Sequence, residues 1–144
     1  MTKIAILGGT GYTACELIKI LLRHSHAEIV AVTSRDEKMP AVAESHPSLA
    51  GRIALRMEPF DASKLRAKGV ECVFGCLPHG ASMEAVAALL SKDEGGRMKD
   101  ETDKSDSSFI PHPSSFPRII DLSADYRLRD ADVYAQWYGE SHHD

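Results

Sequence analysis

The chain opens with a short apolar run at residues 3–7, then a glycine-rich stretch, then apolar positions at helical spacing. An unbroken apolar run is typical of a central parallel strand that is buried on both faces. The later apolar positions follow the i, i+3, i+4, i+7, i+8 pattern of a helix packed on a sheet, and they are Ala14, Leu17, Ile18, Leu21 and Leu22. The pattern predicts a strand, a turn and a helix in direct succession.

Four further segments have strand-like patterns: residues 28–33, the alternating Ile53, Leu55 and Met57, residues 70–77, and residues 118–122. Strands and helical segments alternate along the chain. This alternation predicts a single-domain α/β fold of the Rossmann type, with a doubly wound parallel sheet and right-handed crossovers.

Two more helices are predicted between these strands. Asp61 is placed to cap a short helix that ends at Gly69. The residues 80–82 open a second helix, on which we expect one side to carry Met83, Val86, Ala87 and Leu90.

Residues 91–117 break the pattern, because they are crowded with Lys, Asp, Glu, Ser, Gly and Pro and their few apolar residues show no periodicity. This composition predicts a disordered insertion loop. A lid or a partner-docking segment is the functional alternative.

Composition and charge narrow the functional classes. A chain of 144 residues suits one domain, and the net charge of −4 provides no basic field for nucleic acid. No apolar run approaches the roughly 18 to 20 residues of a membrane helix, and the chain begins directly with its first strand. We therefore expect a cytoplasmic protein without membrane or nucleic-acid partners, whose three cysteines are thiols.

The glycine-rich stretch between the first strand and helix is the strongest functional signal. Glycines let the backbone turn sharply and approach a ligand, and the helix N-terminus offers N–H groups to phosphates. The pattern predicts a dinucleotide pyrophosphate site at Gly8, Gly9, Thr10, Gly11, Tyr12 and Thr13. The alternative is an ordinary tight turn that binds nothing.

The end of the second predicted strand distinguishes the two nicotinamide dinucleotides. It carries Ser34 and Arg35, and a guanidinium with a hydroxyl donor suits the ribose phosphate of NADP. We therefore expect NADP rather than NAD. Asp36 leaves the alternative open, because a one-residue shift of register would place a carboxylate there, and a solvated Arg35 is the non-functional alternative.

Leu77 and Pro78 follow the fourth predicted strand, and we expect them to form a wall of the cofactor site at the carboxyl edge of the sheet. The next residue, His79, lies between proline and glycine, so we interpret it as shaping the turn rather than as an acid or base.

No catalytic residue and no metal ligand is predicted. Cys72 and Cys76 are four residues apart in one predicted strand, so both should pack on the same face as core residues. Cys15 lies in the first helical turn, where a dipole lowers a thiol pKa, but no neighbouring residue supplies a base.

Several motifs together carry a family resemblance. They are the loop from Gly8 to Thr13, Thr33-Ser34-Arg35, Leu77-Pro78-His79-Gly80, and above all residues 120–128, followed by Tyr134, Trp137, Tyr138-Gly139 and His142. With these the chain resembles the N-acetyl-gamma-glutamyl-phosphate reductase family of semialdehyde dehydrogenases. The resemblance covers the chain except for the 91–117 insertion, with Gly9 and Ala14 as departures from the usual residues.

The resemblance implies an enzyme of arginine biosynthesis that reduces N-acetylglutamyl phosphate, an acyl phosphate, with NADPH by way of a cysteine thioester. The family's cysteine lies in an Asn-Pro-Gly-Cys motif and its histidine lies in a second domain, and this sequence contains neither motif. We therefore expect residues 1–144 to form the amino-terminal NADP-binding domain, inactive by itself, of a protein that is a homo-oligomer at full length.

Two alternatives stay open: a stand-alone NADP-binding regulatory module and an aspartate-semialdehyde dehydrogenase-type domain. The role of Arg127 is open too. It either contacts an acyl-phosphate oxygen or pairs with Asp121 or Asp125 to fix a turn.

Overall fold

A computed structural model describes residues 1–91 and 117–139 of the chain. Within these residues a four-stranded sheet has the order β2-β1-β3-β4, and every neighbouring pair is parallel. The strands are β1 (Thr2–Leu7), β2 (Ala27–Val32), β3 (Cys72–Gly75) and β4 (Arg118–Asp121). The parallel α/β sheet that the sequence predicts is confirmed.

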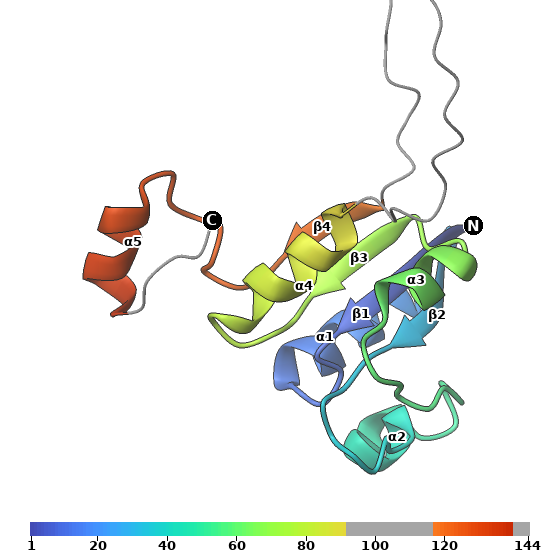
Figure 1. The fold of residues 1–144 in the computed structure, drawn as a ribbon. Coiled ribbons are helices and arrows are strands. Elements are labelled where there is room, and N and C mark those ends of the chain that lie inside the picture. The colour runs from blue at the N-terminus through green and yellow to red at the C-terminus, as the bar shows by residue number, and fades with distance from the viewer. Residues whose placement is uncertain (92–116, 140–144) are drawn as a thin grey trace, which may run out of the picture.

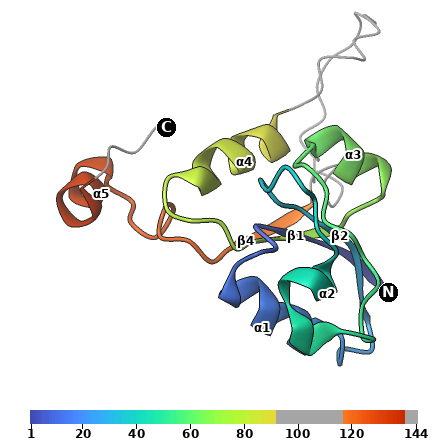
Figure 2. The same cartoon turned by 90° about the horizontal axis from the view of Figure 1, so that it is seen from below.

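Helices cover both faces of the sheet (Figure 2). On one face lie α1 (Tyr12–Leu21) and α2 (Val42–Ser45), the latter followed by the 3₁₀ turn η1 (Pro47–Leu49). The other face carries α3 (Ala62–Ala67) and α4 (Ala81–Leu90), whereas α5 (Ala131–Tyr138) stands apart, beyond the ends to which the strand arrows point (Figure 1). The arrangement is doubly wound, as expected.

Each face of the sheet has its own apolar core. The core beneath α1 contains Ile4, Ile6 and Val32 from the strands with Ala14, Cys15, Ile18 and Leu21 from the helix. The core beneath α3 and α4 contains Ala5, Leu7, Ala31 and Val73 with Leu65, Ala85 and Leu89. Alternate residues of β1 serve opposite cores, as a strand buried on both sides requires.

The predicted strand around Ile53, Leu55 and Met57 is wrong. The segment forms only isolated bridges, Ala41 with Arg56 and Thr33 with Glu58, because its backbone groups are divided between two different partners. Met57 N donates to the Pro40 carbonyl and Glu58 N donates to the Val32 carbonyl. The alternation of apolar residues reflects packing against the α1-side core rather than a ladder of hydrogen bonds.

Helix α4 is confirmed, but its buried side is not the predicted one. Met83 is buried as expected, whereas Leu90 is 53% exposed and Ala87 faces solvent. The buried positions are Ser82, Met83, Ala85 and Leu89. Helical spacing groups Leu90 with Met83, but the residue of this last turn that reaches the core is Leu89. On α1 a similar error concerns Leu22, which is the C-cap and 36% exposed.

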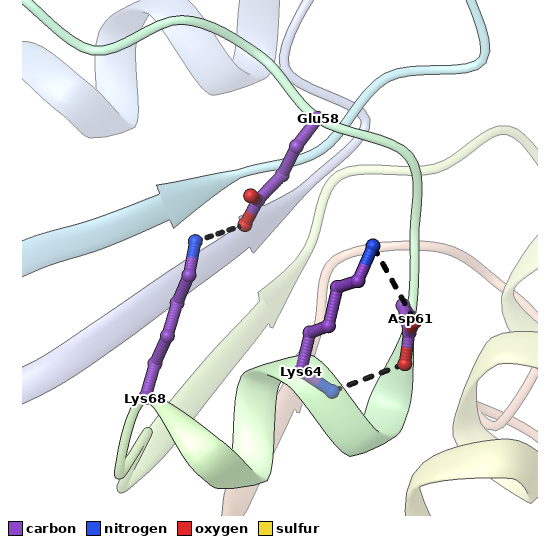
Figure 3. A network of polar contacts seen from close by, with 4 residues as sticks. All are labelled: Glu58, Asp61, Lys64 and Lys68. Atoms are coloured by element: carbon purple, nitrogen blue, oxygen red, sulfur yellow. Dashed lines mark hydrogen bonds and ion pairs between the residues drawn. The ribbon is translucent and has the colours of Figure 1, made fainter.

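Helix α3 has the predicted cap. The Asp61 carboxylate accepts a hydrogen bond from Lys64 N at 3.0 Å, and Gly69 follows the helix with a φ of +70°. Figure 3 shows the Lys64–Asp61 ion pair and a second pair, in which Lys68 reaches back to Glu58. These exposed pairs contribute little energy, but the second joins the end of α3 to the segment bridged to Thr33.

The predicted loop at 91–117 lies outside the described residues, apart from its two ends, and so does His142. All three cysteines are free thiols, as the sequence predicted. Among the described helices, none has the length and apolar character needed to span a membrane.

Candidate functional site

A cavity of about 1000 Å³ opens at the carboxyl edge of the sheet, where ligands bind in folds of this class. It lies between the glycine-rich loop, the end of β2, the end of β3 and the first turns of α4. Its lining residues are Leu7, Gly8, Thr10, Gly11, Thr13, Thr33, Ser34, Arg35, Asp36, Phe60, Cys76, Leu77, Pro78, His79, Gly80, Ala81, Glu84, Ala85 and Ala88.

Two glycines of the loop are required by the protein's own packing. Gly8 has a φ of +79°, and a Cβ there would lie 2.7 Å from the Cys76 carbonyl oxygen. A Cβ on Gly9 would lie 2.3 Å from Val32 Cγ1, so any side chain there would force Val32 to shift. Because these two residues lack a side chain, the loop can pack closely against the ends of β2 and β3.

Gly11 differs, because no contact or backbone angle within the described residues demands a glycine there. Its φ is −78°, and a Cβ would meet only the Gly8 carbonyl oxygen, at 3.7 Å. Gly11 nevertheless lines the cavity. A ligand that approaches the backbone closely is the physical reason for a glycine at such a position, so the loop fits a dinucleotide.

The first turn of α1 is open to an anion. Its N-cap is Gly11, which provides no side-chain cap, and its first turn contains no acidic residue. The N–H groups of that turn therefore have no carboxylate competing for them, and the helix dipole adds a partial positive charge. The hydroxyl-bearing Thr10 and Thr13 also line the cavity beside it.

The end of β2 places a cation on the cavity wall. Arg35 lines the cavity, between the buried Ser34 and the residue Asp36. Ser34 Oγ accepts from Asp36 N at 3.0 Å, and Asp36 Oδ1 accepts from Lys38 N at 2.9 Å. The Asp36 carboxylate thus accepts a hydrogen bond within the turn formed by residues 36–38, although Asp36 also borders the cavity.

The opposite wall is fixed by a buried carboxylate that the sequence did not single out for this role. Asp125 is fully buried and accepts hydrogen bonds from Gly80 N at 3.0 Å and Ser82 N at 3.2 Å. Tyr134 of α5 donates its hydroxyl to the same carboxylate at 3.0 Å. Asp125 therefore caps α4 and connects it to α5.

His79 accepts a hydrogen bond on Nδ1 from Ala124 N at 3.1 Å. Because a backbone N–H only donates, Nδ1 is unprotonated and the neutral ring carries its proton on Nε2. The ring also lies against Tyr138, with 5.8 Å between centroids. These contacts agree with a histidine that shapes the turn.

Cys72 and Cys76 pack on the α1-side face, as predicted, but they are only half buried and Cys76 borders the cavity. Burial raises the pKa of the Cys72 thiol, and burial together with the Asp121 charge raises the pKa of Cys76 to about 11. Neither is a thiolate at neutral pH. Cys15 is buried, with Sγ 3.8 Å from Ser48 Oγ.

Most of the predicted cofactor residues are brought together around the cavity. The exceptions are Gly9 and Tyr12, the latter 80% exposed, which are not among the lining residues. Arg127 donates to the Leu122 carbonyl at 3.2 Å, while Asp121 accepts from Ser123 and Asp125 caps α4. Neither of the two predicted ion pairs, Arg127 with Asp121 or Arg127 with Asp125, is among the contacts of the described residues.

Sequence reasoning missed the α4 residues of the cavity, Glu84, Ala85 and Ala88, and also Phe60. The helical spacing of 81, 84, 85 and 88 would have identified one face.

Comparisons with known proteins agree with this geometry. Residues 3–100 match the family model described as semialdehyde dehydrogenase, NAD binding domain. Proteins named N-acetyl-gamma-glutamyl-phosphate reductase from Rhodopirellula baltica and Marinobacter nauticus are each 38% identical, over 97% and 99% of this chain. The chain spans 34% of the length of either relative. The match over more than half of its residues shows that the chain belongs to the semialdehyde dehydrogenase NAD-binding domain family.

Proposed function

We propose that this chain binds NADP(H) in the cavity, with the pyrophosphate on the loop from Gly8 to Thr13 and the ribose phosphate on Ser34 and Arg35. The observation that carries the proposal is the pairing of an uncapped α1 N-terminus with Arg35 on one cavity wall. A pyrophosphate suits the first and a ribose 2′-phosphate suits the second. Leu77 and Pro78 form the wall on the β3 side.

NADP rather than NAD is supported by the arrangement after β2. NAD-binding sites place an acidic residue on the ribose hydroxyls, whereas an arginine accommodates the additional phosphate. Asp36 already accepts Lys38 N with one of its oxygens, and Arg35 stands between it and the buried Ser34. The guanidinium is therefore the stronger determinant of the ribose end.

We further propose that the chain supplies the nucleotide-binding part of an N-acetyl-gamma-glutamyl-phosphate reductase, as the names of the relatives suggest, and that it acts in the cytoplasm. The bound dinucleotide would supply a hydride for the reduction of an acyl phosphate to an aldehyde. The chain's own residues bind and orient it. With the thiol pKa of Cys76 at about 11, we assign no nucleophile to this chain and expect no turnover from it alone.

Calorimetric titration of the chain with NADPH and with NADH tests the proposal. Arg35→Ala should weaken NADPH binding roughly 10- to 100-fold, the value of a charge-assisted bond to phosphate, and should leave NADH binding within about twofold. Arg52→Ala, at an exposed arginine that does not line the cavity, is the matched control. An NADPH preference that survives Arg35→Ala unchanged would refute the assignment of Arg35.

A further inference from the structure

A buried histidine lies directly behind the glycine-rich loop. His46 is 8% exposed, and its Nε2 is 2.7 Å from the carbonyl oxygen of Gly9. Because a carbonyl only accepts, Nε2 must carry the proton and donate. The His46 backbone is fixed as well: its N–H donates to Val42 O at 2.9 Å, and its carbonyl accepts from Leu49 N at 2.9 Å.

This hydrogen bond determines how one peptide of the loop faces. Gly9 N donates to the Thr33 carbonyl at 2.7 Å, so both backbone polar groups of Gly9 are held from outside the loop. The described peptide bonds are all trans, and in a trans peptide the N–H points opposite to the carbonyl. With the Gly9 carbonyl held by His46, the N–H of Thr10 points away from His46.

Thr10 lines the cavity, whereas His46 is not among the lining residues. Any influence of His46 on a ligand must therefore pass through the loop. The segment that carries His46 also contacts the helix that follows the loop, since Ser48 Oγ lies 3.8 Å from Cys15 Sγ in α1.

We propose that His46 is a positioning residue for the phosphate loop: by donating to the Gly9 carbonyl, it turns the Thr10 N–H toward the pyrophosphate of the dinucleotide. The inference rests on the proposed function, and it assigns the orientation of the loop to a side chain that does not touch the ligand.

The contact itself is tested without any ligand. In the wild-type chain, long-range ¹H–¹⁵N spectra should show the His46 ring with a proton on Nε2, and amide exchange at Gly9, whose N–H donates to the Thr33 carbonyl, should be slow. His46→Leu, which keeps the volume but removes the donor, should accelerate that exchange about tenfold. An unprotonated Nε2, or exchange unchanged in a folded His46→Leu variant, would overturn the proposal.

The effect on binding is tested with two probes, NADP⁺ and adenosine 2′-phosphate, which lacks the pyrophosphate. His46→Leu should weaken NADP⁺ binding about tenfold, as expected for one lost hydrogen bond to a buried acceptor, and should change adenosine 2′-phosphate binding less than about twofold. His46→Gln, whose amide keeps a donor, should restore most of the NADP⁺ affinity. His26→Leu, at an exposed histidine, is the control.

The outcomes separate the two proposals. Equal weakening of both probes, or a His46→Gln variant as weak as His46→Leu, would contradict an orienting role for the donor. If the wild-type chain binds neither NADP⁺ nor adenosine 2′-phosphate, the proposed function fails, and slow exchange lost in His46→Leu would still establish that His46 orders the loop.

Discussion

Two ten-residue helices begin at the walls of the same cavity, and their N-termini are satisfied in opposite ways. At α1 the N-cap is Gly11, with no side-chain cap and no acidic residue in the first turn. At α4 the N-cap is Gly80, whose N–H and that of Ser82 are both bound by the buried Asp125. The α4 first turn also contains Glu84, which lines the cavity.

The difference shows how one sheet edge can hold two helix N-termini and still prefer one position for an anion. Both helix dipoles favour negative charge. At α4 the protein supplies that charge itself through Asp125, and Glu84 repels a further anion. At α1 neither the N-cap nor the first turn supplies a negative charge, and we propose that a ligand supplies it. The two sites also differ in their glycines, since the left-handed Gly80 serves the turn whereas Gly11 keeps the approach to the backbone open.

The largest effect on stability is expected at the N-terminus of α4, where Asp125 binds the helix N–H groups. Asp125→Ala removes the acceptor of the Gly80 N–H and of the buried Ser82 N–H, together with the partner of the buried Tyr134 hydroxyl, and it should lower the free energy of unfolding by about 3 kcal/mol, as unsatisfied buried donors do. Tyr134→Phe removes only the hydroxyl partner and should cost about 1 kcal/mol. Urea denaturation measures both values, and an Asp125→Ala variant as stable as wild type would contradict the capping role.

The thiol in the wall between the two helix starts should be unreactive. With a pKa of about 11 instead of 9.0, Cys76 should carry about a hundredfold less thiolate at pH 8. Its alkylation by iodoacetamide, followed by mass spectrometry, should stay slow at pH 8 and accelerate only as the pH approaches that pKa. Asp121→Asn removes the neighbouring charge and should move the profile to lower pH. A profile with its midpoint near pH 8 would contradict this environment.

The two loop glycines should fail differently. Gly9→Ala places a Cβ 2.3 Å from Val32 Cγ1 and should lower the free energy of unfolding by about 2 kcal/mol through overpacking; the double variant with Val32→Ala should recover part of the loss. Gly11→Ala should change stability by less than about 0.5 kcal/mol but weaken NADP⁺ binding about tenfold. Equal loss of stability in both variants would remove the distinction between packing and ligand approach.

Removing the cap of a third helix, α3, should have the smallest effect, and it serves as a control for the variants at α1 and α4. Asp61 caps α3 through Lys64 N and does not itself line the cavity, although the preceding Phe60 does. Asp61→Ala should cost about 1 kcal/mol of stability and leave the affinity for NADP⁺ within about twofold, as measured by thermal unfolding and calorimetry. A large loss of affinity would show that helix capping affects the cavity generally.

The sequence predicted what depends on local pattern. The unbroken run of β1, the spacing of α1 and the Asp61 cap of α3 are all encoded in neighbouring residues, and the structure confirms them. The segment with Leu55 failed because strand-like alternation arises whenever one side of a chain packs on a core, with or without a ladder.

What the sequence could not show were contacts between distant positions. Asp125 and Gly80 are 45 residues apart, and His46 and Gly9 are 37 apart. Only the fold brings these pairs together, so no spacing rule identifies them. The cavity face of α4, with Glu84 and Ala88, is not identified by apolar spacing, because residues 83, 86, 87 and 90 also form an apolar stripe of helical period on another side of the helix.

Titration of the ¹⁵N-labelled chain with NADP⁺, followed through its amide signals, tests most directly whether the anion binds at α1. The account predicts that the largest shifts occur at the amides of residues 10–13, with Gly80 and Ser82 nearly unchanged because Asp125 holds their N–H groups. Shifts largest at Gly80 and Ser82, or no response of residues 10–13 to saturating NADP⁺, would contradict it.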